Sequence, residues 1–194
     1  MKVLGIYASP RKGGNTDQLL DKALEGARSA GAEILTAYAR KLKMRGCIEC
    51  GGCDKTGICV VKDDMQSVYP LLEEADAVIL ASPIFFYGLT AQVKAVIDRS
   101  QAMWSKRMIE KTPKERKTYD SGRGYLIAVA ATKGKNLFLA AEIVAKYFYD
   151  ALDMSYEGGL LLRGLEKKTA VQENPDLLQQ AFDLGRKAAR PTPS

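Results

Sequence analysis

Short apolar runs alternate along the chain with longer segments in which apolar residues recur at helical spacing. The apolar runs have strand length and predict five β-strands, at residues 3–7, 33–38, 77–81, 125–131 and 154–162. The run at 77–81 is continuously apolar, which is typical of a central strand buried on both faces. The helical spacing predicts helices that begin near Asn15 and at Thr90, and helices that cover 63–74, 137–152 and 175–189. Strands that alternate with helices need crossover connections, so the pattern predicts a parallel sheet with helices on both faces.

The predicted fold is α/β and flavodoxin-like: one domain over residues 1–194, built on a doubly wound five-stranded parallel sheet. A chain of 194 residues with 46% hydrophobic content can bury one sizeable core, and its length does not require a second domain. In such sheets, ligands bind beyond the carboxyl ends of the strands, where the strand order reverses. We therefore expect the loops at Ser9, Ser82 and Thr132 to meet on one rim, with the cysteines opening on the same side.

Two segments interrupt the alternating pattern: a cysteine-rich insertion at about 44–62 and a long basic loop at about 105–122. Much of the net charge of +6 lies in this loop and in the C-terminal tail. No aromatic interleaving or recognition motif accompanies the charge, so we expect a solvated loop and no nucleic-acid partner.

Hydropathy does not support a membrane span, because no run of about 18 apolar residues occurs, and the N-terminus lacks the apolar core of a secretion signal. All four cysteines fall between Cys47 and Cys59, and such clustering in a reducing compartment indicates metal or redox chemistry. We expect a cytoplasmic protein with no membrane partner. The chain has no histidine, which excludes imidazole acid–base chemistry and favours a reaction carried out by a cofactor.

Residues 8–16 join the first strand to the first helix and are predicted to bind a phosphate. Glycines let the backbone approach a ligand closely, and the start of the helix supplies free N–H groups. Ser9, Asn15 and Thr16 add hydroxyl and amide donors, and Arg11 adds a planar charged fork. The spacing matches neither the dinucleotide fingerprint nor the P-loop, which favours a mononucleotide. The alternative is an ordinary turn capped by Asn15.

The segment that follows the central strand directly is Ile84-Phe85-Phe86-Tyr87-Gly88, and it is predicted to hold a flat heterocycle beside the phosphate. Its backbone amides can bond the polar edge of a ring, and Gly88 allows close approach. FMN satisfies both demands. The alternative for Phe85, Phe86 and Tyr87 is core or interface packing.

The sequence resembles the NADPH-dependent FMN reductase family in two motifs, which are Gly-x-x-x-Ser-Pro-Arg-x-x-x-Asn-Thr at residues 5–16 and Ser-Pro-Ile-Phe-Phe-Tyr-Gly-Leu-Thr-Ala-Gln at residues 82–92. The resemblance implies that the FMN phosphate is held by Ser9, Arg11, Asn15 and Thr16. It implies that the flavin ring is lined by Pro83, Ile84, Phe85, Phe86, Tyr87 and Gly88. A third loop matches by position alone, and its Thr132 and Gly134 are expected beside the flavin. No side chain is predicted to be catalytic, because the flavin does the chemistry.

The cysteines form a compact motif in which Cys47, Cys50 and Cys53 follow one another at a three-residue pitch and Cys59 lies slightly farther along. Compact triple spacing is typical of [4Fe-4S] ligation, whereas zinc sites more often consist of two knuckles with a longer spacer. The motif resembles the iron-sulfur flavoprotein branch of the same family. It departs from the bacterial ferredoxin pattern, in which the fourth cysteine follows sooner and precedes proline. Zinc and four unligated thiols remain the alternatives.

The sequence therefore predicts an FMN-dependent oxidoreductase or electron-transfer flavoprotein in which a [4Fe-4S] cluster exchanges single electrons with FMN. NAD(P)H is the expected co-substrate, and the partner is a small-molecule acceptor or a redox protein such as ferredoxin. The alternatives are a plain NAD(P)H-dependent FMN or quinone reductase without a cluster, and a zinc-bearing interaction module. The resemblance also implies a homodimer or homotetramer, with residues 106–122 as the arm that reaches the neighbouring subunit.

Overall fold

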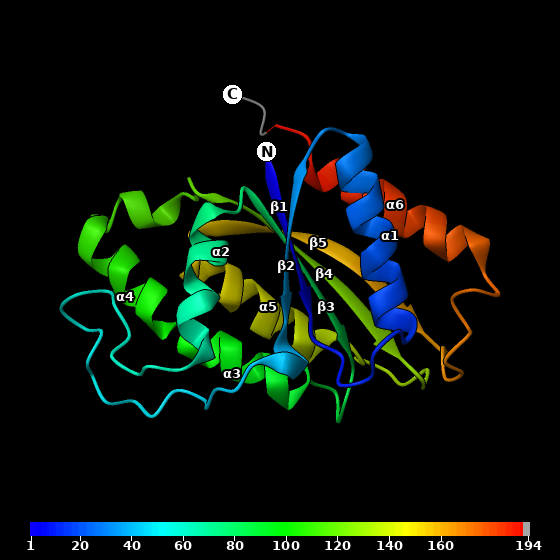
Figure 1. The fold of residues 1–194 in the computed structure, drawn as a ribbon, viewed down its shortest axis with the longest axis horizontal. Coiled ribbons are helices and arrows are strands. Elements are labelled where there is room, and N and C mark those ends of the chain that lie inside the picture. The colour runs from blue at the N-terminus through cyan, green and yellow to red at the C-terminus, as the bar shows by residue number, and fades with distance from the viewer. Residues whose placement is uncertain (192–194) are drawn as a thin grey trace.

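The computed structural model describes residues 1–191 and shows a five-stranded sheet with helices on both faces (Figure 1). The strands are β1 (Lys2–Tyr7), β2 (Glu33–Tyr38), β3 (Ala77–Pro83), β4 (Gly122–Ala130) and β5 (Met154–Arg163). They lie in the order β2-β1-β3-β4-β5, and every neighbouring pair is parallel. The predicted flavodoxin-like fold class is confirmed, and the strand order reverses between β1 and β3.

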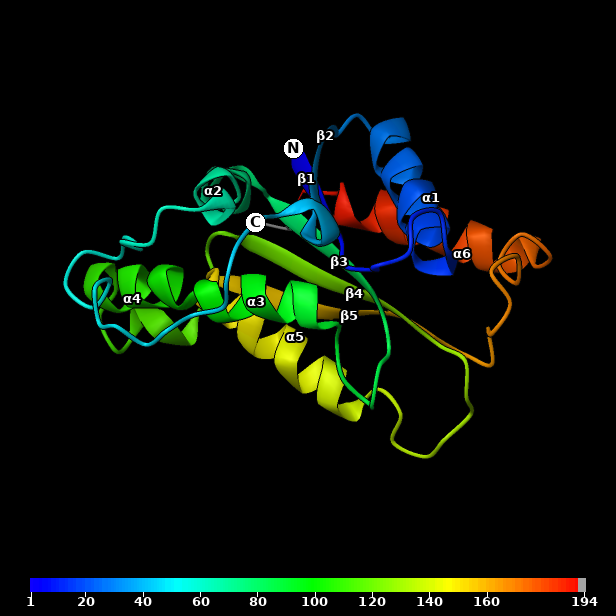
Figure 2. The ribbon, with the colours of Figure 1, turned by 60° about the horizontal axis from the view of Figure 1, so that its bottom comes forward.

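The helices are α1 (Asn15–Ser29), α2 (Tyr69–Glu74), α3 (Ala91–Arg99), α4 (Gln101–Glu110), α5 (Leu139–Ala151) and α6 (Pro175–Ala188). Helices α1 and α6 cover one face of the sheet, and α3 and α5 cover the other (Figure 2). Side chains alternate along each strand, so Leu4 and Ile6 enter one core while Val3 and Tyr7 enter the core under α1. Within residues 1–191, none of the helices has the length and hydrophobicity that a membrane crossing requires.

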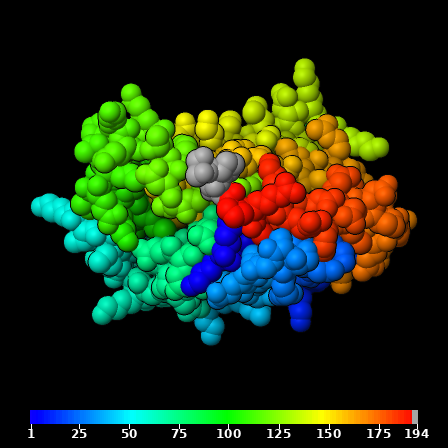
Figure 3. All heavy atoms as spheres, turned by 90° about the horizontal axis from the view of Figure 1, so that it is seen from above, coloured from blue at the N-terminus to red at the C-terminus, as the bar shows by residue number. Residues whose placement is uncertain are grey.

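Helices α1 and α6 approach each other closely because each presents a glycine to the other. A Cβ atom on Gly26 would lie 2.0 Å from the carbonyl O of Phe182, and one on Gly185 would lie 1.7 Å from that of Ala23. In the space-filling view, the red atoms of α6 lie directly against the blue atoms of the α1 region (Figure 3). The last helix of the fold therefore packs backbone to backbone against the helix that follows the first predicted loop.

The helix predicted at 63–74 is divided into a 3-10 helix (Asp64–Ser67) and α2. Asp63 caps the first of these, since its carboxylate accepts the N–H of Met65 at 3.2 Å. Pro70 lies in the first turn of α2 and has no N–H to continue the hydrogen-bonding ladder of the preceding turn. The break therefore follows from the proline, which the apolar periodicity does not reveal.

The segment predicted as a basic loop at 105–122 begins as helix, because α4 continues to Glu110. A 3-10 helix (Glu115–Lys117) follows, and β4 begins at Gly122. Arg107 lies on α4 with its side chain buried. A hydrophobic pattern counts arginine as exposed, so it fails to mark the buried face of this helix.

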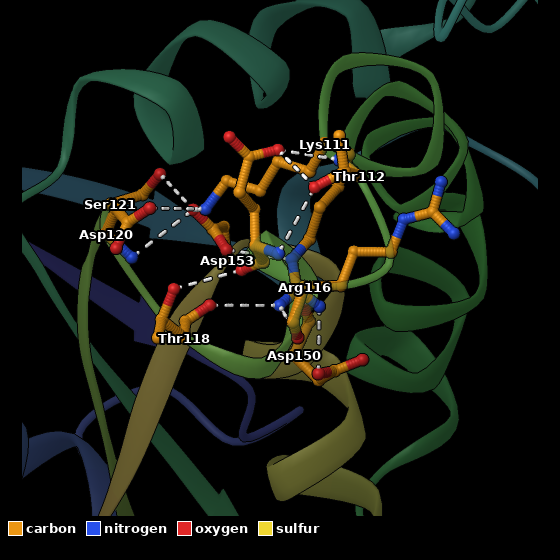
Figure 4. Close-up of polar contacts among 10 residues, drawn as sticks. Lys111, Thr112, Arg116, Thr118, Asp120, Ser121, Asp150 and Asp153 are labelled. Atoms are coloured by element: carbon orange, nitrogen blue, oxygen red, sulfur yellow. Dashed lines mark hydrogen bonds and ion pairs between the residues drawn. The ribbon is translucent and has the colours of Figure 1, made fainter.

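A buried ion network fastens this segment to the end of α5 (Figure 4). Arg107 Nε lies 2.8 Å from Asp153 Oδ1, and its Nη1 lies 3.0 Å from Asp150 Oδ1. Lys111 Nζ is 2.5 Å from the other oxygen of Asp153 and 2.8 Å from Asp120. The segment is therefore tied to its own domain, and its role as an arm that reaches a neighbouring subunit stays a prediction.

The Asp153 carboxylate makes the fold sensitive to acid. Burial raises the pKa of Asp153, but bonds from Lys111, the Asp120 N–H and Arg107 outweigh burial and hold the pKa below its ordinary value. Such a group stabilises the fold above its unfolded pKa of about 3.9, and this contribution is lost as the pH falls through the folded value. In urea unfolding, we expect the wild type to have the higher free energy of unfolding, and we expect its advantage over Asp153→Asn to decrease below about pH 4. A difference that stays constant into that range would contradict this assignment.

Candidate functional site

Loops that follow β1, β3 and β4 meet at the carboxyl end of the sheet, and a cavity of about 250 Å³ opens there. It is lined by Ser9, Pro10, Arg11, Gly14, Asn15, Thr16, Pro83, Ile84, Phe85, Val129, Ala131, Leu165 and Glu166. The cavity thus brings all four predicted phosphate residues together with the start of the aromatic loop. The remaining predicted flavin residues lie outside its lining: Phe86, Tyr87, Gly88, Thr132 and Gly134.

The first loop closes a tight turn before α1 begins. Ser9 Oγ lies 3.1 Å from both the N and the O of Arg11. Gly13 adopts the left-handed conformation, with φ of 66°, and Gly14 occupies the N-cap of α1. The first N–H groups of a helix have no intrahelical acceptor and lie at the positive end of its dipole. Together with the exposed Arg11 side chain, they make this loop suited to an anion.

Asn15 is predicted to hold a phosphate, but its side chain bonds to the backbone of a distant part of the chain. Its amide group donates to the carbonyl O of Lys167 at 2.8 Å, and its Oδ1 accepts the N–H of Val171 at 3.3 Å. These bonds tie the start of α1 to the connection between β5 and α6. Asn15 can therefore serve a phosphate through its backbone N–H, while its amide holds the scaffold.

Arg40 is a site residue that the sequence analysis missed. Its guanidinium pairs with Asp17 at 3.0 Å, and Nη1 donates to the carbonyl O of Ser9 at 3.1 Å. The same group lies over the Tyr38 ring, 5.1 Å from the ring centre. Arg40 therefore braces the first loop from the end of β2. Its sequence signal is its place directly after a predicted strand, a position equally typical of a solvated loop.

The aromatic loop after β3 is a tight hairpin with a strained tip. Phe85 and Gly88 exchange both backbone hydrogen bonds, at 3.0 and 2.9 Å. The two central residues, Phe86 and Tyr87, have positive φ angles of 49° and 64°. Residues other than glycine rarely adopt this conformation, and such strain is concentrated at ligand sites. The Phe86 ring is fully exposed, so it can cover a flat ligand or a neighbouring surface.

Side-chain contacts hold the three loops against one another. Thr90, the N-cap of α3, donates its hydroxyl to the carbonyl O of Ala8 at 2.7 Å and so links the second loop to the first. A Cβ atom on Gly134 would lie 2.7 Å from the Tyr87 hydroxyl, so the third loop contacts the second. Thr132 is fixed through its backbone carbonyl, which accepts an N–H from the chain just after β5.

The flavin loops are the two loops predicted to bind FMN, at residues 8–16 and 82–88. The cysteine segment, residues 44–62, is predicted to open beside them and does not. It leaves the end of β2 and runs along the edge of the molecule to α4 (Figure 1). There, a Cβ atom on Gly57 would lie 2.5 Å from the Cβ of Lys106. Helix α3 begins next to the aromatic loop at Thr90 and ends next to the cysteine segment at Arg99, which separates the two regions by about 13 Å of helix.

All four cysteines line one cavity of about 560 Å³ at the junction of α3 and α4. All four are free thiols. Among residues 1–191, no three Cys, His, Asp or Glu side chains lie close enough together to hold a metal ion. The donor set and the shared cavity therefore fit an iron–sulfur cluster in kind, but the thiols are not gathered around one point.

The surroundings of Cys59 favour its thiolate. Burial alone raises the pKa of Cys59, but the Val61 N–H and the charge of Arg99 are among the effects that outweigh burial and hold the pKa below its ordinary value. The thiolate is the form that binds metals. The surroundings of this cysteine therefore favour the form that a metal would require.

Residues 1–156 match the NADPH-dependent FMN reductase family, and this span contains the flavin loops and the cysteine segment. The chain belongs to this family. The family predicted from the two loop motifs is confirmed.

Two curated relatives match about half of this FMN reductase family member. An iron-sulfur flavoprotein of Archaeoglobus fulgidus is 46% identical over 99 residues, which are 51% of this chain and 45% of the relative. An iron-sulfur flavoprotein of Methanosarcina thermophila is 39% identical over 100 residues, which are 52% of each chain. The chain spans about half the length of the curated relatives it matches.

Solved structures resemble the whole fold. The NAD(P)H:quinone oxidoreductase from Methanothermobacter marburgensis superposes with a TM-score of 0.68 at 14% identity, covering 100% of this chain and 98% of that one. The Trp repressor binding protein from Bacillus subtilis has a TM-score of 0.63 at 23% identity, covering 95% and 99%. At these identities, the likeness establishes the fold alone.

Proposed function

We propose that the protein binds FMN at the rim of the sheet and passes electrons from NAD(P)H to a small-molecule acceptor or a redox protein such as ferredoxin. The observation that carries the proposal is the cavity of about 250 Å³ into which both loop motifs of an FMN reductase family member open. FMN, when bound, accepts two electrons as hydride and releases them singly. The protein supplies its placement and its electrostatic surroundings.

The first loop binds the phosphate through three kinds of group. The helix start provides backbone N–H donors at Asn15 and Thr16, and Thr16 is among the residues that line the cavity. Arg11 provides a charged fork. Ser9 fixes the turn through its bonds to the backbone of Arg11, so its hydroxyl shapes the site as well as lining it.

The aromatic loop binds the ring. Because Phe85 and Gly88 use their N–H groups on each other, the donors left for the polar edge of a flavin are the N–H groups of Phe86 and Tyr87. These two residues carry the strained φ angles, which orient both amides in one short turn. The Pro83 and Ile84 side chains form the wall of the cavity next to this turn.

Cys47, Cys50, Cys53 and Cys59 are the proposed ligands of a [4Fe-4S] cluster that exchanges single electrons with FMN. Their compact spacing, their shared cavity and the likeness to two iron-sulfur flavoproteins support this assignment. Helix α3 separates the cysteines from the flavin loops of the same chain. A cluster and an FMN that lie closer together than the length of α3 would therefore have to belong to two neighbouring subunits.

A homodimer or homotetramer provides such a neighbour. An apolar groove of about 450 Å³ runs between α3, α4 and α5, and its lining includes Trp104, Ile143 and Tyr147, which are exposed in the single chain. This face is proposed as an assembly surface beside the segment at 106–122. The clustered free thiols fit a reducing compartment, so the cytoplasm is the proposed location.

The second candidate is a plain NAD(P)H-dependent FMN or quinone reductase without a cluster, favoured by thiols that are not gathered around one point. A zinc-bearing interaction module is a third. Visible spectra of anaerobically purified protein separate the three, because flavin and iron–sulfur absorption differ in shape and zinc gives no colour. Steady-state NADPH oxidation then separates a reductase from an electron carrier. Protein that carries no flavin after incubation with FMN would overturn the proposal.

Replacing Arg11 with alanine is expected to weaken FMN binding by one to two orders of magnitude. A charge-assisted bond to a partly buried phosphate is worth about 1.5–3 kcal/mol, which converts to that change in affinity. Fluorescence titration of the apoprotein measures it. The matched control is Lys12→Ala, which removes the neighbouring exposed charge. Equal affinities in the two variants would show that general charge, and not the Arg11 fork, attracts the phosphate.

A further inference from the structure

Arg99 is the last residue of α3, and only 2% of it is exposed. Burying a charge is costly unless the charge is paired and hydrogen-bonded. Arg99 lines the cysteine cavity, at the end of α3 remote from the flavin loops. The reason for a buried arginine at this position must therefore lie in its contacts there.

The Arg99 guanidinium joins the two ends of the cysteine segment. Its Nη1 donates to the carbonyl O of Arg45 at 3.1 Å, and its Nη2 donates to that of Val61 at 3.3 Å. Arg45 precedes the first cysteine, and Val61 follows the last. One side chain therefore closes the base of the loop that carries all four thiols.

Asp63 completes this clamp. Its carboxylate pairs with Arg99 Nη1 at 2.7 Å and accepts the backbone N–H of Arg45 at 3.4 Å. The Tyr69 hydroxyl donates to the carbonyl O of Arg99 at 2.9 Å and so fixes the end of α3. Protein groups alone form all of these bonds, so the base of the loop is closed without a metal.

One N–H group of Arg99 is left over. Within the described residues, Arg99 Nε is buried and has no hydrogen-bond acceptor, although the other nitrogens of the guanidinium are bonded. An unsatisfied buried donor is costly and calls for an acceptor. Cluster sulfurs accept such bonds, and hydrogen bonds to them, together with net charge, set the reduction potential of an iron–sulfur cluster.

We propose that Arg99 is a positioning residue for the cysteine site. It holds the ends of residues 45–61 together before iron arrives, and it then supplies a buried positive charge and one N–H to the sulfurs. The inference rests on the proposed cluster. Closing a loop costs conformational entropy that grows with loop length. The clamp closes the loop during folding, so iron binding does not have to overcome this loss of entropy. The four thiols are then already held in one closed loop when iron binds.

The first test uses metal-free protein and measures amide hydrogen exchange. Arg99→Lys keeps the charge, but a single ammonium group cannot span both carbonyls. Arg99→Gln combined with Asp63→Asn removes the ion pair without leaving a buried carboxylate unpaired. Both variants are expected to speed exchange in residues 45–61. The control is Arg107→Lys, which alters a buried arginine on α4 whose partners lie outside the segment.

The second test uses anaerobically reconstituted protein. Both Arg99 variants are expected to bind iron about 10–100-fold more weakly in competition with a chelator, as is usual when a residue that supports metal ligands is lost. FMN content should stay at the wild-type level, which confirms that the variants fold. In a titration where dithionite passes one electron to each cluster, the midpoint potential should be lower in both variants than in the wild type, because neither variant keeps the Arg99 Nε–H that bonds to the sulfurs.

The outcomes separate the inference from the function on which it rests. If the wild type binds no iron after reconstitution, the proposed cluster and the inference fail together. If the wild type binds iron and both Arg99 variants hold it as tightly, the cluster stands and the inference fails. Exchange in residues 45–61 that matches the Arg107→Lys control would also overturn it, because Arg99 would then stabilise the fold in general and not this loop.

Discussion

Replacing Cys53 with alanine is expected to remove most of the iron from anaerobically purified protein while FMN stays bound. Four thiolates bind a cluster as a set, so the loss of one ligand releases the whole cluster. FMN depends on loops at the other end of α3, which share no lining residue with the cysteine cavity. Iron, acid-labile sulfide and flavin are measured for both proteins.

The matched control for this experiment is Ile48→Ala, an exposed position between the first two cysteines that lines the same cavity but offers no donor. It should keep its iron. Iron near zero in the wild type itself, after strict exclusion of oxygen and chemical reconstitution, would reject the cluster. A plain flavin reductase with four clustered thiols would then remain.

Replacing Asp153 with asparagine is expected to lower the free energy of unfolding by about 3–5 kcal/mol, the usual cost of removing one partner from a buried ion pair. Arg107 and Lys111 share this carboxylate and would keep their charges without it. Asp153 has a φ of 59°, a conformation that asparagine also tolerates, so backbone strain does not enter the comparison. Urea unfolding monitored by circular dichroism measures the change.

Asp120→Asn is the control for this network, because Asp120 pairs with the same lysine but its side chain is 64% exposed. A surface pair of this kind contributes about 0–1 kcal/mol. Equal losses in the two variants would mean that burial adds nothing to the network and that residues 106–122 are held to the domain by other contacts.

Periodicity predicts the sheet and most of the helices because a buried parallel strand and an amphipathic helix each leave a pattern in consecutive residues. The motif of the first flavin loop is also visible in consecutive residues, because its glycines, serine and asparagine all lie within residues 8–16. A single sequence therefore contains what is needed to predict the fold class and the position of both loops.

Three arginines lie beyond such reasoning. Arg99 and Arg107 are buried and Arg40 is partly buried, but all three occur among other polar residues, so a pattern counts them as exposed. Each leaves the solvent because carboxylates from distant parts of the chain meet it in the folded protein. The path of the cysteine segment escapes prediction for the same reason, since its base is fixed by Arg99.

The hydrogen bonds of Asn15 to Lys167 and Val171 bear on when the site can form. The ribosome releases the N-terminal part of a chain first, and domains begin to fold from that end. Asn15 is translated 152 residues before Lys167 and 156 residues before Val171, which hold its side chain in place. A phosphate site at this loop is consequently complete only after these residues have been translated, and a nascent chain that stalls before them leaves the ribosome without a finished site.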